Sequence, residues 1–152
     1  WDTFEHLTDP HRVLKGISSQ LSPSGLFVFS TPNTSSLEWV AMDREHIQLL
    51  PPGHVNLYNT KNIEVILRAN DFEVVCLETL NPSLDLTYLR SAVMKVEGEE
   101  ESISSRALKI LLNEVLEDTV LPVITREFRE KKLAGNMVVV ARKLGVVGKN
   151  SF

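Results

Sequence analysis

The sequence is poor in cysteine, in long apolar runs and in clustered glycine, and each shortage excludes a class of protein. A single cysteine, Cys76, cannot form an internal disulfide, which excludes a disulfide-stapled secreted domain and favours a reducing, cytoplasmic location. No apolar stretch approaches the roughly 20 residues of a membrane-spanning helix, so we expect no membrane span. The seven glycines are scattered, so the chain has no glycine-rich loop for a nucleotide-like cofactor.

Positive charge is also scarce. Lys and Arg number 16 against 20 Asp and Glu, which leaves a formal net charge of -4. Proteins that bind nucleic acid gather positive charge on one surface, so we expect no nucleic-acid partner. The rest of the composition is ordinary: 152 residues, of which 43% are hydrophobic, suffice for one domain with a core.

Apolar periodicity and turn residues predict alternating helices and strands. Asp9 and Pro10 are typical of a helix start, because Asp caps free amides and Pro fits the first turn. Thr60 is expected to cap a later helix, and Pro122 to interrupt the helical pattern. Helices are predicted over residues 10–21, 37–47, 60–69, 103–116 and 121–132, and strands over residues 26–31, 72–80 and 136–142.

This alternation predicts an α/β layered fold. The first strand is nearly continuously apolar, as in a parallel strand buried on both faces, whereas the second alternates, as expected near a sheet edge. We expect one domain over residues 1–145, a helical insertion over residues 85–133 and a disordered tail over residues 146–152. Three strands are few for a complete doubly wound sheet, so the remainder of such a sheet is expected upstream.

Five short motifs occur in an order that resembles class I S-adenosylmethionine-dependent methyltransferases. They include Glu-His-Leu followed by Asp-Pro, a Pro-Ser-Gly turn, a strand with a Ser-Thr-Pro-Asn exit, and a His-Val-Asn-Leu-Tyr stretch; Asp71 stands where the last motif usually has Gly. The motifs lie at residues 1–10, 21–25, 27–33, 54–59 and 70–74. The resemblance is to the group that includes ubiquinone-pathway O-methyltransferases and sugar- or envelope-modifying enzymes. It implies a partial Rossmann-like sheet with flanking helices, in which an antiparallel last strand at residues 137–143 belongs to the edge hairpin that closes the fold.

The departure from the family pattern is as informative as the match. The family holds S-adenosyl-L-methionine on a glycine-rich loop after its first strand and on an acidic residue after its second. This chain has neither, and its first residue is not a methionine. It also lacks the basic start and apolar middle of a signal peptide. We therefore expect a C-terminal, acceptor-side fragment that begins within a longer reading frame and is inactive alone.

The resemblance assigns roles to residues near the two histidine motifs. Trp1, Asp2 and Thr3 would border the donor, because ligands bind at the carboxyl ends of parallel strands. Removal of a proton from an acceptor oxygen suits a histidine, because histidine titrates near neutrality. His54 is the first choice, with His6 and Glu5 also assigned to catalysis; the alternative for Glu5 and His6 is that they only orient their turn.

An acceptor-binding region is expected over residues 35–58. Its polar and aromatic candidates are Asn33, Trp39, His46 and Tyr58. The helices expected over residues 103–132 would cover the acceptor site or form a homodimer contact, although an apolar stripe is more often core.

The implied function is methyl transfer, by the parent enzyme, to an oxygen of a small molecule or glycan. Two alternatives stay open: a non-catalytic interaction module, or a metal-assisted RNA 2′-O-methyltransferase. In the metal alternative Asp2, Glu5, His6 and the later His54 would be the ligands. We expect no metal, because Glu-His is common in relatives without one.

Overall fold

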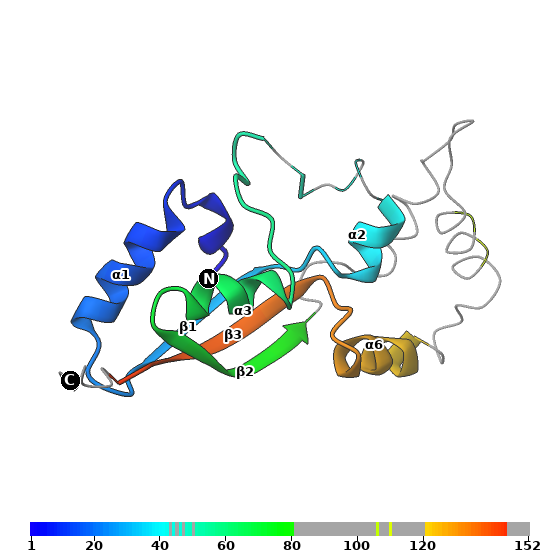
Figure 1. The fold of residues 1–152 in the computed structure, drawn as a ribbon. Coiled ribbons are helices and arrows are strands. Elements are labelled where there is room, and N and C mark those ends of the chain that lie inside the picture. Colours follow the sequence, from blue (N-terminus) through cyan, green and yellow to red (C-terminus); the bar gives the residue numbers. More distant parts are fainter. Residues whose placement is uncertain are drawn as a thin grey trace.

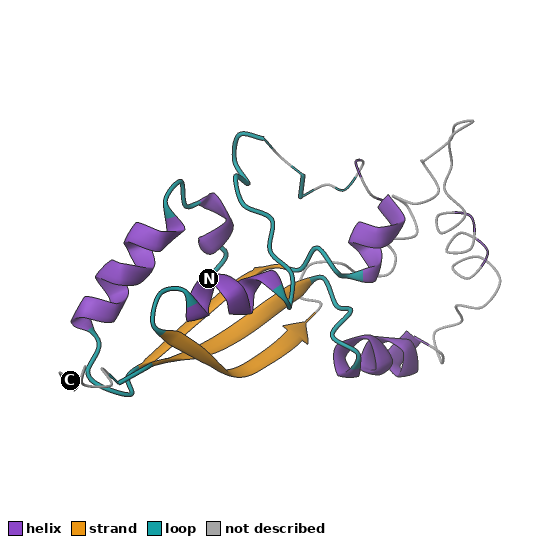
Figure 2. Ribbon diagram, in the orientation of Figure 1, coloured by secondary structure: helices purple, strands orange, loops and turns teal. Residues whose placement is uncertain are grey.

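The computed structural model describes residues 1–42, 44, 46, 48–49, 51–80, 106, 110 and 121–145. Figures 1 and 2 show a small sheet with helices beside it and a long loop that leads into α3. The elements are η1 (Phe4–His6), α1 (Pro10–Gln20), β1 (Leu26–Pro32), α2 (Leu37–Met42), α3 (Asn62–Arg68), β2 (Phe72–Leu80), α6 (Leu121–Glu130) and β3 (Asn136–Lys143).

Local sequence explains where several elements begin. α1 starts at Pro10 because the Asp9 carboxylate accepts a hydrogen bond from the Arg12 amide at 2.9 Å. The expected cap of α3, Thr60, is wrong: Asn59 Oδ1 accepts from the amides of both Lys61 and Asn62, at 2.9 Å each. α3 begins at Asn62 with Lys61 at its N-cap position, where no side chain caps the helix, and the Asn59 side chain instead binds the amides of the preceding turn.

The turn into β2 explains a departure from the family motif. Asp71 stands where Gly is usual, and its φ is 64°, in the left-handed region that Gly enters most easily. Asp tolerates this region better than most residues. The tight turn is therefore kept without glycine.

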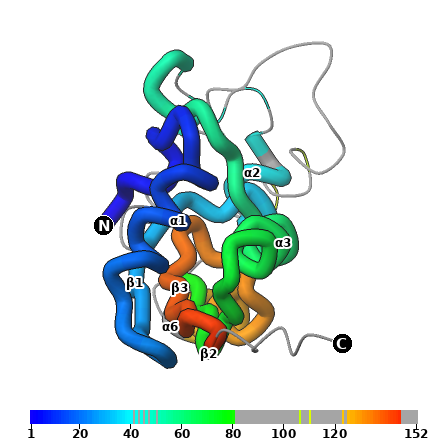
Figure 3. The backbone as a smooth tube through the Cα atoms, turned by 60° about the vertical axis from the view of Figure 1, so that its left-hand side comes forward, coloured from blue at the N-terminus to red at the C-terminus, as the bar shows by residue number. Residues whose placement is uncertain are grey.

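The sheet order is β1-β3-β2, and β3 pairs antiparallel with both neighbours. Figures 1 and 3 show β3 between its two partners. The expectation of an antiparallel last strand is confirmed, and β3 forms with β2 the antiparallel pair at one edge of the sheet. β2 occupies that edge, because the chain returns through α6 and inserts β3 between the two earlier strands.

One face of the sheet carries the core. Residues of α1, α3 and η1 pack there against alternate residues of the three strands. The core comprises Phe4, Leu14, Phe29, Tyr58, Ile63, Leu67, Phe72, Leu77, Met137, Val139 and Ala141. The expectation that β1 is buried on both faces holds only for its second half, because Leu26 and Val28 remain 55% and 50% exposed on the other face.

Several expectations can be followed only in part. The helix expected over residues 37–47 is shorter, since α2 ends at Met42 and His46 is not helical. The helix expected over residues 121–132 is present as α6, which ends at Glu130. The expected helix over 103–116, most of the insertion 85–133 and the tail 146–152 lie outside the described residues. Within the described ranges, no helix has the length and apolar character needed to cross a bilayer.

Candidate functional site

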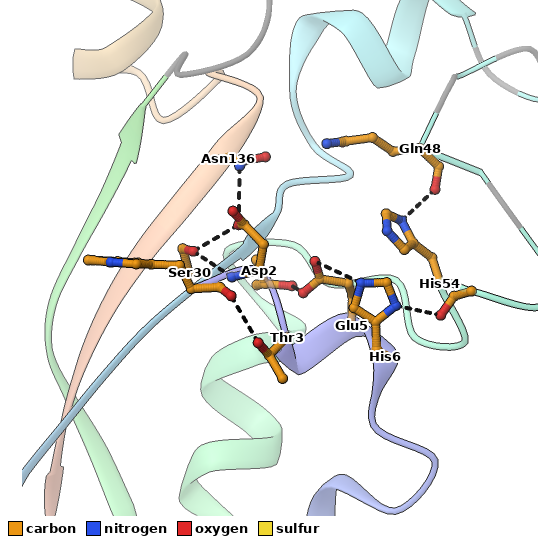
Figure 4. A network of polar contacts seen from close by, with 11 residues as sticks. Asp2, Thr3, Glu5, His6, Ser30, Gln48, His54 and Asn136 are labelled. Atoms are coloured by element: carbon orange, nitrogen blue, oxygen red, sulfur yellow. Dashed lines mark hydrogen bonds and ion pairs between the residues drawn. The ribbon is translucent and has the colours of Figure 1, made fainter.

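Glu5 is the buried centre of the site. Its side chain is almost fully buried, at 2% exposure, and its Oε2 accepts a hydrogen bond from Thr31 Oγ1 of β1 at 3.0 Å. Its backbone carbonyl accepts from the amides of Val55 and Asn56, at 3.1 and 3.0 Å. Glu5 thus fastens the loop that carries His54 to the end of β1, so a carboxylate and two histidine-bearing segments meet at one place (Figure 4).

The two histidines of the site are held in the same way. Nδ1 of His6 lies 2.7 Å from the Gly53 carbonyl oxygen, and Nδ1 of His54 lies 2.7 Å from the Gln48 carbonyl oxygen. A carbonyl can only accept, so each Nδ1 carries the hydrogen. In the neutral rings Nε2 is therefore the atom with a free lone pair. The rings meet edge to face, with centroids 4.7 Å apart.

The site is rich in acceptors. His6 Nε2 lies 3.8 Å from Glu5 Oε1, and a ligand atom from each of Glu5, His6 and His54 lies within 4.8 Å of the other two. Such a group can take up a proton or hold a cation. The three residues assigned to catalysis from sequence are thus brought together, although their roles stay predictions.

Tyr58 adjoins this group from the core side. Its ring packs on Phe4 at a centroid distance of 5.1 Å. Burial, and then the charge of Glu5, raise the pKa of Tyr58 to about 12, so the phenol stays protonated at neutral pH. Its buried hydroxyl has no hydrogen-bond partner among the described residues.

The residues expected to border the donor are held by a second polar network. Ser30 Oγ donates to Asp2 Oδ1 at 2.8 Å and accepts from the Asp2 amide at 3.0 Å, while Asn136 Nδ2 lies 3.5 Å from the same Oδ1 (Figure 4). The Thr3 hydroxyl donates to the Trp1 carbonyl, and the Trp1 indole is 76% exposed. Sequence reasoning missed Ser30 and Asn136; a serine within the apolar strand was the available indication.

This network fits only part of a donor site. The Asp2 carboxylate is engaged by protein donors, and the exposed Trp1 ring offers one apolar wall. The described residues include no glycine-rich turn that lets a ligand approach the backbone closely. The residues present therefore suit one side of a bound donor.

The side chain of Asn33 forms hydrogen bonds only with backbone groups among the described residues. Its Nδ2 donates to the carbonyls of Lys132 and Ala134, at 3.1 and 3.0 Å, and its Oδ1 accepts from the Ser35 amide at 3.1 Å. It is fully buried and ties the exit of β1 to the segment before β3. Its predicted contact with an acceptor remains a prediction.

Trp39 and His46 form a separate buried pair. Their rings stack at 4.1 Å with an interplanar angle of 12°, and their exposures are 8% and 3%. His46 Nδ1 accepts from the Gln48 amide at 3.1 Å, and burial lowers the pKa of His46 to about 4. His46 is thus neutral at physiological pH. Beside Trp39 in α2, burial also raises the pKa of Glu38, against smaller opposing effects of hydrogen bonds from its own backbone and Ser36.

The fold is shared with solved methyltransferases. A SAM-dependent methyltransferase from Archaeoglobus fulgidus superposes with a TM-score of 0.50 at 18% identity, covering 93% of this chain and 56% of its own. A methyltransferase solved in complex with the Haloferax volcanii Trm112 methyltransferase activator gives 0.50 at 13% identity, covering 95% and 51%. The chain therefore spans about half the length of these structures. The expected partial Rossmann-like methyltransferase fold is confirmed.

Sequence comparison gives the family. The model of the methyltransferase domain family matches residues 1–77, half of the chain. This chain belongs to that family, which confirms the resemblance drawn from the motifs. No curated protein matches it.

Proposed function

We propose that this chain forms the acceptor side of an S-adenosylmethionine-dependent methyltransferase that methylates an oxygen of a small molecule or glycan. The family supports methyl transfer, and one observation supports oxygen as acceptor: both His6 and His54 direct Nδ1–H to a carbonyl, and a ring nitrogen of each lies within 4.8 Å of a carboxylate oxygen of Glu5. The lone exposed thiol of Cys76 is consistent with the reducing, cytoplasmic location that we propose.

In this proposal His54 is the general base. Its Nε2 takes the proton of the acceptor hydroxyl, and the Gln48 carbonyl fixes the ring in the required tautomer. S-adenosylmethionine, when bound, supplies the methyl group. Trp1, Asp2 and Thr3 would form part of the wall next to it.

The test is His54→Asn in the complete enzyme. Asn keeps a donor where Nδ1–H stands but has no atom to replace the basic Nε2. We expect kcat to fall about 10²- to 10⁴-fold, the usual contribution of general base catalysis. The affinity for S-adenosylmethionine should change little. His11→Asn, on the exposed face of α1, is the matched control. An unchanged kcat in the His54 variant would remove the proposed base.

A second candidate, metal-assisted transfer, is favoured by the cluster of Glu5, His6 and His54. Histidines that bind metal usually donate their other ring N–H to a carbonyl or carboxylate, as both do here. A carboxylate and two imidazoles suit Zn²⁺ or a similar ion and leave a position for the acceptor oxygen, whose pKa the ion would lower. Asp2, part of the set expected from sequence, is held instead by Ser30 and Asn136.

Titration calorimetry with Zn²⁺ on the 152-residue chain separates the two candidates. Metal assistance predicts binding that weakens at least about tenfold in Glu5→Gln and in His54→Asn but not in His11→Asn, because one of three ligands is lost. It also predicts that a chelator abolishes turnover and that a divalent ion restores it. If turnover is the same with and without chelator, metal assistance is excluded and His54 as general base is the candidate that stands. The negative net charge speaks against RNA as the acceptor.

The interaction-module alternative makes a different prediction. The complete protein would then fold and show no heat of binding with S-adenosylmethionine. A homodimer contact through residues 103–132 is also a proposal, and sedimentation analysis of the complete protein tests it.

A further inference from the structure

Gln48 lies between two histidines and is bonded to both through its backbone. Its amide donates to Nδ1 of His46 at 3.1 Å, and its carbonyl oxygen lies 2.7 Å from Nδ1 of His54 (Figure 4). The first bond fixes the amide of Gln48, and the second binds the ring of the proposed base. A change at His46 can therefore reach His54 through a single residue.

His46 holds the peptide groups on both sides of Gln48. Besides the bond from its side chain to the Gln48 amide, its backbone carbonyl accepts from the amide of Leu49 at 2.8 Å. In a planar trans peptide group the N–H and the C=O point in opposite directions. Because the Leu49 amide is turned towards His46, the Gln48 carbonyl in the same peptide group points away from His46, and it meets His54. The direction of this carbonyl is thus set by His46.

The ring of His46 is suited to the role of a fixed acceptor. It is 3% exposed and stacks on Trp39 with an interplanar angle of 12°. Burial lowers the pKa of His46 to about 4, so Nδ1 keeps its lone pair for the Gln48 amide at neutral pH. His46 can thus act on His54 without touching the methyl acceptor, the contact that the sequence suggested for it.

The tautomer of His54 decides which of its nitrogens can take a proton. In a neutral imidazole the position of the hydrogen is set by the bonds that the ring nitrogens make. A carbonyl only accepts, so a carbonyl held at Nδ1 of His54 keeps the hydrogen there and leaves the lone pair on Nε2. When no carbonyl is held at Nδ1, the hydrogen is free to occupy Nε2, and the ring then presents a donor at the place of the base.

We propose that His46 is a positioning residue for His54: by holding the two peptide groups that flank Gln48, it keeps the His54 ring in the Nδ1–H tautomer and in its orientation. This role rests on the proposed function, in which Nε2 of His54 is the reacting atom. Gln48 acts through its backbone alone, so substitution of its side chain should leave both bonds in place.

Substitutions at His46 separate its hydrogen bond from the packing of its ring. His46→Phe keeps an aromatic ring against Trp39 but has no acceptor, whereas His46→Asn loses the ring but keeps an oxygen for the amide two residues ahead. The nitrogen NMR spectrum of the complete enzyme reports the tautomer of His54, whose signals are assigned by their loss in His54→Asn. The Phe variant should show a mixture of the Nδ1–H and Nε2–H forms, and the Asn variant should keep the Nδ1–H form. His11→Phe, on the exposed face of α1, is the matched control and should change nothing at His54.

Turnover adds a readout that packing alone does not produce. We expect kcat to fall about 10-fold in His46→Phe, in line with the loss of a group that orients a reactive histidine. His46→Asn and Gln48→Ala should keep most of the turnover, and the affinity for S-adenosylmethionine should be unchanged in all three. In the His54→Asn background, His46→Phe should cause no further fall, since no base remains to be positioned. A purely structural role predicts the reverse order, with His46→Asn the more damaged because it loses the stacked ring.

Two results would overturn this role for His46. One is an unchanged Nδ1–H form of His54 in His46→Phe, and the other is a loss of that form in His46→Asn as large as in His46→Phe. His46→Leu, which also lacks an acceptor, replaces the Phe variant if that variant does not fold.

The proposed base fails by a different result. If His54→Asn keeps its kcat while His46→Phe still shifts the tautomer, His54 is not the base but His46 does set its tautomer. If His54→Asn loses kcat while the tautomer in His46→Phe is unchanged, the base stands and the role of His46 is overturned.

Discussion

Two histidine environments lie on either side of Gln48, and their chemistry is opposite. Gln48 donates its amide to His46 and offers its carbonyl to His54. His46 is buried against Trp39 and kept neutral, with its pKa lowered to about 4. His54 lies edge to face with His6, and a ring nitrogen of each lies within 4.8 Å of a carboxylate oxygen of Glu5. The contrast shows that surroundings, not residue type, separate a structural histidine from a chemically available one.

The largest expected effect on stability is at the buried pair. Trp39→Ala should lower the free energy of unfolding by about 3–5 kcal/mol, the usual cost of removing a buried aromatic ring. Trp1→Ala is the matched control, because removal of the exposed Trp1 ring should lower the free energy of unfolding by less than about 0.5 kcal/mol. Urea unfolding of both variants measures this. Equal losses would show that the Trp39 environment is not a packed one.

The pH dependence of stability should come next in size. The folded pKa of His46 is about 4 and the ordinary value is 6.5, so between these values the unfolded chain binds the extra proton. Stability is then unaffected above pH 6.5 and falls by up to about 3 kcal/mol as the pH drops to 4. His46→Asn keeps an acceptor for the Gln48 amide but does not titrate. Between pH 6.5 and 4 the denaturant midpoint should change less with pH in that variant than in the wild type. An equally large change with pH in both proteins would contradict the assignment to His46.

Glu5→Ala should have a smaller effect on stability. It removes the acceptor of the buried Thr31 hydroxyl but leaves the backbone bonds of Glu5 to the loop, so we expect a loss of about 1–3 kcal/mol. Glu5→Gln, which retains an oxygen for Thr31, should recover most of it. Thermal unfolding of the two variants checks this, and a full loss in both would assign the stabilisation to the charge.

The smallest change in stability is expected for the substitution His6→Asn. The His6 side chain is 45% exposed, and Asn can still donate towards Gly53, so the change should stay within about 0.5 kcal/mol. The same substitution should weaken the binding of a cation by Glu5, His6 and His54. A loss of stability as large as that of Trp39→Ala would contradict the view that His6 contributes little to the stability of the fold.

Much of the secondary structure could be predicted from local patterns. The bounds of α1, β1 and β2 lie within a residue or two of those expected, because capping and periodicity act over a few neighbouring residues. The grouping of Glu5, His6 and His54 followed from motif resemblance. The Asp2 network and the Trp39–His46 stack could not be predicted, since each joins segments whose approach depends on the folding of the loop between them.

The sequence by itself determined the family, the helix and strand segments and the residue types at the site, because these are recorded in local spacing. The tertiary structure decided the sheet order and the burial that keeps His46 neutral. Strand order depends on the return of the chain through α6, and the lowered pKa of His46 depends on the burial of its ring in the folded chain. Neither is a property of any short stretch of sequence.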